Sequence, residues 1–269
     1  MINFDYVRPA SVADASRALM GANATAIAGG HTLIPTLKQR LAKPAVLVDL
    51  TGIAELKGIR RENHSLIVGA TTTHAEVASS TEVHKAIPAL AKLAGGIGDA
   101  QVRHRGTIGG SIANNDPAAD YPAAVLALGA TIVTNKRQIE ADKYFTGLFS
   151  TALTPGEIVV SIRFPIPERA GYAKMEQRAS RYCLVSVFVA KGKGGLFSSG
   201  EVRTAVSGAG SNGVFRVPAI EQALRHKFSP EAIRGIAVPA GGLMSDMHGS
   251  ADYRAALITV MAQRAVTAA

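Results

Sequence analysis

Two glycine-rich segments constrain this chain more than any other feature of its sequence. The first is Ala28-Gly29-Gly30-His31-Thr32, and the second is Thr107-Ile108-Gly109-Gly110-Ser111, which leads into Asn114-Asn115-Asp116-Pro117. Glycine adopts positive φ readily and lets the main chain approach a ligand closely. Successive free N–H groups in such a turn form a concave, electropositive nest that suits phosphate. Two nests predict a ligand with two phosphates, a dinucleotide, although glycine pairs are equally typical of ordinary turns between strands and helices.

The composition describes a globular chain with a basic excess. Its 269 residues suffice for one large domain or two modest ones, and 47% of them are hydrophobic. The formal net charge is +9, but Lys and Arg are scattered, and the densest group is Arg103-His104-Arg105. No basic run alternates with aromatic residues, so we expect no nucleic-acid partner. An anionic cofactor or an acidic partner subunit explains the charge as well.

The single cysteine, Cys183, lies in an apolar run and is expected to be buried in the core. One thiol forms neither an intrachain disulfide nor a four-thiolate iron–sulfur site. The seven histidines show no metal-ligand spacing, so we expect no metal site, and no pattern indicates a catalytic residue of this chain. The N-terminus lacks signal-peptide features, and the longest uncharged apolar segment, 121–133, is too short to span a bilayer. We therefore expect a cytoplasmic protein that is not transmembrane.

Hydrophobic periodicity predicts a mixture of helices and strands. In the first part we expect helices at 12–20 (capped by Ser11), 33–41, 74–79, 88–94 and 122–128, and strands at 25–28, 45–50, 53–59, 65–68, 130–134 and 156–165. Beyond Pro165 the pattern changes to three strands at hairpin spacing. These strands are expected at 172–176, 182–190 and 202–208, with helices at 219–225, from Ser229, and at 253–265. We expect a mobile hairpin loop at 191–200.

One further glycine pattern is interpreted as an ordinary surface turn. Gly208-Ala209-Gly210-Ser211-Asn212-Gly213 matches G-x-G-x-x-G and follows a strand. A dinucleotide site of the Rossmann type also needs a helix that opens at this turn. Here the extended run Val214-Phe215-Arg216-Val217-Pro218 follows instead.

The two glycine segments, with their flanking residues, resemble the flavin motifs of the medium subunits of molybdenum hydroxylases. The first motif comprises Ala28 to Pro35, Arg40-Leu41 and Pro44 to Leu50, and the second runs from Thr107 to Pro122. Other matching positions are Gly156-Glu157-Ile158, Phe164-Pro165, Lys174 and Gly208-Ala209-Gly210-Ser211. The resemblance covers nearly the whole chain and extends in particular to flavoprotein subunits of the aerobic carbon monoxide dehydrogenase type. Xanthine dehydrogenase carries the same module within a longer chain.

This resemblance implies an α+β fold with an FAD-binding part of the vanillyl-alcohol oxidase (PCMH) type, made of two subdomains. A domain with a small antiparallel sheet and helices follows. We expect the FAD-binding domain at 1–167, with subdomains at about 1–55 and 56–167. The remainder, 168–269, would form a domain like the C-terminal domain of carbon monoxide dehydrogenase flavoproteins.

The resemblance also implies the residues that contact FAD. Backbone N–H groups of 27–34 and 107–111 would wrap the pyrophosphate, and Tyr182 would cover the isoalloxazine ring. Asp120 and Lys174 correspond to polar contacts, and Ile97 and Ile158 to apolar ones. The expected set is Ile27, Ala28, Gly29, Gly30, His31, Thr32, Leu33, Ile34, Ile97, Thr107, Ile108, Gly109, Gly110, Ser111, Asp120, Ile158, Lys174 and Tyr182. One departure from the family is Arg181, where many relatives have Asp before the aromatic residue.

The implied function is that of an FAD-binding electron-transfer subunit in a heteromeric molybdenum hydroxylase. Members of the family work with a small subunit that carries 2Fe–2S clusters and a large subunit that carries the molybdenum cofactor. We expect these partners here, in a dimer of heterotrimers, with electrons passing through FAD to an external acceptor (NAD, a quinone or a cytochrome). A free-standing FAD-dependent reductase or oxidase of the same fold is the alternative, and a non-enzymatic anion-binding protein is a third. The sequence does not identify the substrate or the acceptor.

Overall fold

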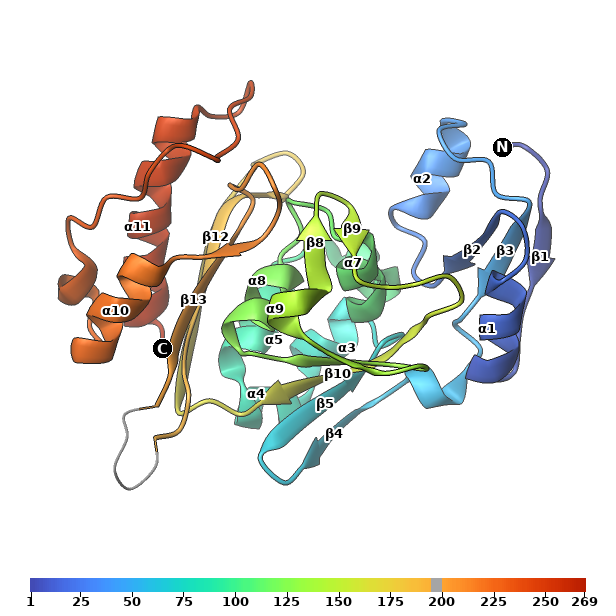
Figure 1. Ribbon diagram of the computed structural model, residues 1–269, viewed down its shortest axis with the longest axis horizontal. Helices are drawn as coiled ribbons and strands as arrows, with labels where there is room; N and C mark the ends of the chain where they lie inside the picture. The colour runs from blue at the N-terminus through green and yellow to red at the C-terminus, as the bar shows by residue number, and fades with distance from the viewer. Residues whose placement is uncertain (195–199) are drawn as a thin grey trace.

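Three structural units follow one another along the chain and lie in a row (Figure 1). The computed structural model describes residues 1–194 and 200–269, so part of the predicted loop at 191–200 lies outside the described residues. Figure 1 shows the N-terminal unit at the right in blue, the second unit in cyan and green at the centre, and the third in yellow to red at the left. Within the described residues, no helix is long and apolar enough to cross a membrane.

The N-terminal unit is a small parallel sheet with helices at its crossovers. Its strands β1 (Asp5–Val7), β3 (Val46–Asp49) and β2 (Ala24–Ile27) lie in the order β1-β3-β2. Helix α1 (Val12–Leu19) begins at the predicted cap, because the Ser11 side chain accepts the Asp14 N–H at 3.1 Å. Helix α2 (Leu33–Lys38) ends three residues earlier than predicted.

The second unit is an antiparallel sheet covered by helices. The sheet order is β4 (Ile59–Glu62), β5 (Ser65–Gly69), β10 (Val159–Pro165), β6 (Thr131–Thr134) and β7 (Gln138–Glu140). Its helices are α3 (His74–Ser79), α4 (Thr81–Ala86), α5 (Pro88–Gly95), α6 (Ala100–Arg105), α7 (Ile108–Asn114), α8 (Tyr121–Ala127) and α9 (Ala141–Tyr144). A hairpin of β8 (Phe145–Gly147) and β9 (Ser150–Thr151) follows α9.

Two predictions for this unit were wrong. The strand expected at 53–59 is mostly a 3-10 turn, η1 (Ala54–Leu56), and only Ile59 enters a strand. Ile53 and Leu56 are both fully buried, and their spacing of three residues places them on one side of such a turn. The second glycine segment is not a turn but most of helix α7, which begins after Thr107.

The third unit confirms the predicted change of pattern after Pro165. Strands β11 (Arg169–Glu176), β12 (Cys183–Lys191), β13 (Val202–Ser207) and β14 (Phe215–Arg216) form an antiparallel sheet in chain order. Its helical elements are α10 (Pro218–His226), the 3-10 turn η2 (Pro230–Ile233), where a helix was expected from Ser229, and α11 (Ala251–Thr267). The turn at 208–213 joins two antiparallel strands and opens no helix. Cys183 is buried, as predicted.

Helix α8 binds the second and third units together. All seven of its residues are buried, and it packs against β12 and β13 on the side of the sheet opposite α11. One hydrophobic core therefore extends from the second unit to Tyr172, Phe188 and Ala205 of the third. The second core lies between this sheet and α11, with Val187, Val189 and Ile258 among its members.

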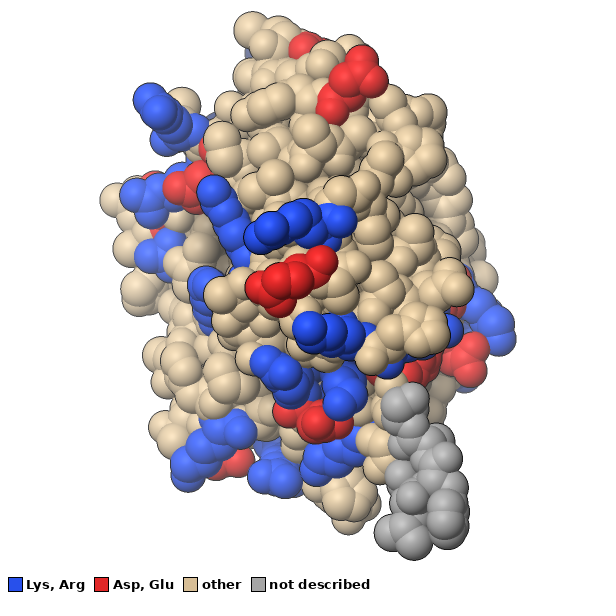
Figure 2. Space-filling view, turned by 90° about the vertical axis from the view of Figure 1, so that its left-hand side faces the viewer, with Lys and Arg blue, Asp and Glu red and all other residues tan. Residues whose placement is uncertain are grey.

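Charges on the outer side of the third unit do not form a continuous basic stripe. Figure 2 shows Lys and Arg in separate groups there, with Asp and Glu between them, and the upper part of this face carries a few Asp or Glu side chains in an otherwise uncharged surface. Within the described part of the third unit, several cations are paired, such as Lys191 with Glu168 at 3.1 Å and Arg225 with Glu221 at 4.0 Å.

Candidate functional site: a cleft lined by all three units

A cleft of about 610 Å³ is lined by residues of all three units. Its walls come from the β2–α2 connection of the first unit, from the α5–α6 connection and α7 of the second, and from the β11–β12 loop of the third. The volume falls in the range of small-molecule and cofactor sites. All of the predicted FAD contacts line this cleft except Ile34, Ile108 and Lys174.

The first glycine segment supplies free backbone donors. Within the described residues, the N–H groups of Gly29, Gly30, His31 and Thr32 have no protein acceptor. Gly30 has a φ of +73°, a left-handed conformation in which successive N–H groups can turn to one side. A row of unpaired N–H groups on a cleft wall is the arrangement that binds an anionic group, phosphate above all.

Close packing joins the two glycine segments. A Cβ atom on Gly29 would lie 2.2 Å from the Arg105 carbonyl oxygen and 2.7 Å from the Gly106 Cα atom. Both of these contacts are to backbone, which has little freedom to move aside. Gly29 therefore lets the first segment pack against the backbone directly before the second segment.

The second glycine segment differs from the predicted nest. Four of its five N–H groups are already used: Ile108 and Gly109 donate to the Thr72 and Ala70 carbonyls at 3.1 and 2.8 Å, and Gly110 to the Thr107 hydroxyl at 3.2 Å. Ser111 donates to the Thr107 carbonyl at 3.0 Å. These bonds start α7, so the run of successive free donors in the cleft comes from the first segment, and among the described residues the second adds only the Thr107 N–H.

Gly109 and Gly110 have separate roles in this helix. A Cβ atom on Gly109 would lie 2.5 Å from the Ala70 Cβ atom. This glycine therefore lets α7 pack closely against Ala70, which directly follows β5. A Cβ atom on Gly110 would meet only the Thr107 hydroxyl oxygen, at 2.9 Å, and is otherwise in open space. Gly110 lines the cleft. Its missing side chain therefore leaves room for a ligand that lies against α7.

A buried ion pair lies at one end of the cleft. Asp120, on the cleft wall just before α8, pairs with Lys174 of β11 at 3.0 Å, and the two side chains are 6% and 7% exposed. Tyr172 donates its hydroxyl to the same carboxylate. Burial, together with the neighbouring Asp120, raises the pKa of Tyr172 well above its usual range, so the hydroxyl keeps its proton. Lys174 thus does not line the cleft itself, and it acts on the site by pairing with Asp120, which does.

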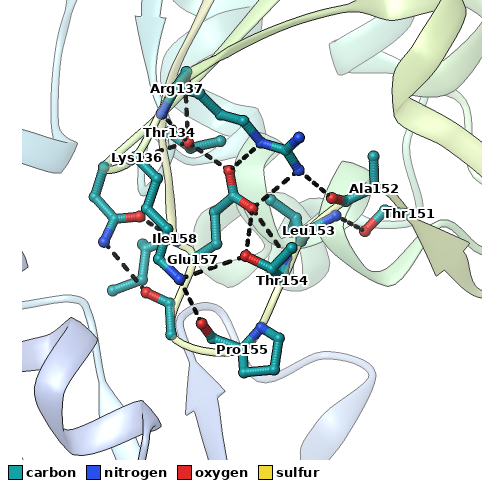
Figure 3. Close-up of polar contacts among 12 residues, drawn as sticks. Thr134, Lys136, Arg137, Thr151, Ala152, Leu153, Thr154, Pro155, Glu157 and Ile158 are labelled. Carbon is teal, nitrogen blue, oxygen red and sulfur yellow. Dashed lines mark hydrogen bonds and ion pairs between the residues drawn. The ribbon is translucent and has the colours of Figure 1, made fainter.

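Glu157 is the centre of a second buried network, shown in Figure 3. Its carboxylate accepts from Arg137 Nε at 3.0 Å, from the Thr134 hydroxyl at 2.8 Å, and from the Thr154 N–H and hydroxyl at 2.9 Å each. Although burial opposes it, this set of donors lowers the pKa of Glu157 to about 2. The network fixes the 152–158 segment, from which Leu153 and Ile158 face the cleft.

The same segment attaches the first unit to the second. The Asn135 carboxamide oxygen accepts the Ile158 N–H at 2.8 Å, and its nitrogen donates to the Ser16 hydroxyl of α1 at 3.0 Å. The Ser16 hydroxyl in turn donates to the Gly156 carbonyl at 2.7 Å. These bonds hold the two sides of the cleft at a fixed separation.

His74 also lines the cleft, and the sequence did not single it out as a site residue. It begins α3, is buried, and lies with its ring 5.4 Å from that of Tyr121. Burial, helped by the nearby His31 and Arg103, lowers the pKa of His74 to about 4. His74 is therefore neutral at physiological pH and serves as a packing residue against Tyr121 and Gly106.

These features fit FAD. The cleft has the size of a cofactor site, unpaired N–H groups for a pyrophosphate, and an open surface at Gly110 where a side chain would intrude. Tyr182, whose exposed fraction is 53%, lies at the mouth as an aromatic surface for a planar ring. Among the described residues, no group of three or more His, Cys, Asp or Glu side chains is placed to hold a metal ion.

Comparisons with known proteins point in the same direction. The family described as "FAD binding domain in molybdopterin dehydrogenase" matches residues 2–167. The carbon monoxide dehydrogenase medium chain of Hydrogenophaga pseudoflava is 34% identical over 99% of this chain and 96% of its own. The nicotine 6-hydroxylase medium subunit of Paenarthrobacter nicotinovorans is 35% identical over 98% and 96%. A chain in the solved structure of reconstituted CO dehydrogenase from Oligotropha carboxidovorans has a TM-score of 0.89 at 33% identity, with coverage of 100% and 99%.

Proposed function

This chain belongs to the family of FAD-binding medium subunits of molybdenum hydroxylases, and on that premise we propose that it transfers electrons in a heteromeric molybdenum enzyme. The observation that carries the proposal is the cleft. Both glycine segments meet there, and the N–H groups of 29–32 are unpaired. The fold and the matching FAD-binding family are those of the flavoprotein component of an oxidoreductase.

Bound FAD would supply the redox chemistry, while the protein supplies binding, orientation and electrostatics. The N–H groups of 29–32 would hold the pyrophosphate. Gly110 would let the cofactor lie against α7, and Ile97 and Ile158 would provide apolar contacts. Asp120, held by Lys174 and Tyr172, would place a fixed polar group at one end of the site.

The partners follow from what this chain lacks. With one cysteine, the chain cannot bind an iron–sulfur cluster through four of its own thiolates. We propose a small partner with the clusters and a large partner with the molybdenum cofactor, assembled as a dimer of heterotrimers. Their chemistry would set the substrate. The expected cytoplasmic location stays a prediction.

Isolation of the chain from its native cells tests this function. A tag on the chain should recover a cysteine-rich small chain and a large chain, together with FAD, iron and molybdenum. Mass photometry of the complex tests the dimer of heterotrimers. A chain that is recovered alone and rapidly oxidises NADH or an organic substrate would instead support the free-standing reductase. A colourless preparation that takes up no FAD would contradict both flavoprotein functions.

A further inference from the structure

The α5–α6 connection, Gly96-Ile97-Gly98, forms one wall of the cleft and is held by its carbonyl groups. Lys174 Nζ donates to the Gly96 carbonyl at 3.1 Å. Arg103 Nη1 donates to the Ile97 and Gly98 carbonyls at 3.1 and 2.9 Å. Three successive carbonyl groups are thus turned toward cations from β11 and α6. These bonds fix the backbone of the wall that carries Ile97.

A further cation reaches this wall from the third unit. Arg181 lies in the loop between β11 and β12, and its Nη1 donates to the Gly98 carbonyl at 3.3 Å. Gly98 and Arg181 both line the cleft, and they belong to different units. The bond therefore joins two walls at the mouth of the cleft.

The backbone of this loop is shaped to present Arg181 and Tyr182 together. Arg181 has a φ of +58°, a conformation that costs a non-glycine residue of order 1 kcal/mol and persists only where surrounding contacts maintain it. The Arg181 N–H donates to the Gln177 carbonyl at 2.8 Å, and the Gln177 N–H donates to the Tyr182 carbonyl at 2.9 Å. The loop is thus a closed turn, and movement of Arg181 must move Tyr182.

Charge also favours Arg181 at this position. Asp99 follows Gly98 directly and caps α6, with its carboxylate accepting the Val102 N–H at 2.8 Å. That bond, together with the Arg103 and Arg181 guanidinium groups, holds the pKa of Asp99 below its usual range. Asp99 is therefore ionised at neutral pH and attracts the Arg181 side chain to the rim.

We propose that Arg181 is a positioning residue that latches the Tyr182 loop to the cleft wall at Gly98 and so fixes the Tyr182 ring over the cleft. The latch itself depends only on contacts within this chain. Its consequence for FAD, which is restricted exposure of the bound cofactor to solutes, rests on the proposed function. A residue with the opposite charge at position 181 would face Asp99 and open the loop.

Hydrogen–deuterium exchange on the full chain without FAD tests the latch. The variants are Arg181→Gln, Arg181→Lys and Arg181→Asp, and Arg178→Gln is the matched control, because Arg178 is exposed in the same loop. We expect the Arg181 and Gln177 amides to exchange about three to ten times faster in Arg181→Gln, the effect of one lost hydrogen bond. Arg181→Lys should restore part of the protection, and Arg181→Asp should exchange fastest. Equal exchange in Arg181→Gln and Arg178→Gln, or slower exchange in Arg181→Asp, would overturn the proposal.

A second readout uses the complex loaded with FAD. Iodide quenching of flavin fluorescence should be about twofold or more stronger in Arg181→Gln than in Arg178→Gln, since a released Tyr182 ring uncovers the cofactor. If Arg181→Gln exchanges its amides faster but shows unchanged quenching, the proposed shielding of FAD is refuted while the contact between Arg181 and Gly98 is still supported. A complex without FAD would contradict the proposed function, while the exchange experiment would still decide the latch.

Discussion

Replacement of Glu157 by Gln should destabilise the fold through a loss of charge at a buried site. The Glu157 side chain is fully buried, and its oxygens accept from Arg137, Thr134 and Thr154 (Figure 3). A pKa of about 2, against an ordinary value of 4.5, corresponds to about 3 kcal/mol of stability at neutral pH. Because the Arg137 side chain is 48% exposed and partly screened by water, we expect about 2–3 kcal/mol.

The stabilisation by the Glu157 carboxylate should decrease as the pH falls. The folded-state pKa of Glu157 lies below the unfolded value, so its contribution is complete above about pH 4.5 and declines as the pH falls toward about 2. The difference in unfolding free energy between the native chain and Glu157→Gln should therefore be largest at pH 7. By about pH 3 more than half of it should be lost.

Thermal and urea unfolding measured at pH 7 and pH 3 provide the assay. At pH 7 the melting temperature of Glu157→Gln should fall by about 4–10 °C for a chain of this length. The matched control is Glu140→Gln, which breaks an exposed pair with Lys143 and should cost less than about 0.5 kcal/mol. A variant as stable as the native chain at pH 7, or a difference that is the same at both pH values, would refute the reasoning.

Two further predictions concern the cleft walls. Gly29→Ala places a Cβ atom 2.2 Å from the Arg105 carbonyl oxygen, just before the second glycine segment, so FAD affinity measured by flavin titration should fall at least about tenfold. Gly241→Ala, whose Cβ atom would meet nothing within 4 Å, should bind normally, and equal affinity in the two variants would contradict the packing argument. His74, with its pKa lowered to about 4, binds its proton less readily in the folded than in the unfolded chain. Urea unfolding should therefore show stability declining by about 2 kcal/mol from pH 7 to about pH 5, and His74→Leu should flatten this decline; an unchanged slope would exclude His74 as its source.

The parts of the fold that the sequence predicted well are those with local signals. Ser11 with Asp14 marks the start of α1, and the alternation from Tyr172 onward marks an antiparallel sheet. The pairing of the two glycine segments was predicted from the family motif. The structure adds its physical cause, which is that Gly29 packs directly on the backbone of Arg105 and Gly106.

The parts that were missed depend on contacts distant in sequence. Two adjacent glycines disfavour a helix, so Gly109 and Gly110 predicted a turn. The Ala70 and Thr72 carbonyls accept the first N–H groups of α7 and override that preference. The donors to Glu157 likewise include Thr134 and Arg137, which lie 23 and 20 residues earlier. The sequence around Glu157 therefore does not distinguish this buried acid from one on the surface.

The assignments of individual FAD contacts remain predictions, and the structure sharpens them unequally. The N–H groups of 29–32 are free to bind phosphate, whereas those of 108–111 bind other parts of the chain. Lys174 contacts Asp120 and the Gly96 carbonyl and stays behind the cleft wall. We therefore expect substitutions in the first segment to act on phosphate binding, and those at Gly110 to act by excluding the cofactor.

The flavin content of the purified complex with a Gly110→Val chain tests the central proposal most directly. A valine side chain would occupy the open surface of α7 that faces the cleft. The native complex should hold one FAD for each copy of this chain. The Gly110→Val complex should assemble with its iron and molybdenum intact, with a melting temperature near that of a Gly95→Ala control, and should contain little FAD. A native complex without flavin, or a Gly110→Val complex with a full complement of FAD, would contradict the assignment of this cleft as the FAD site.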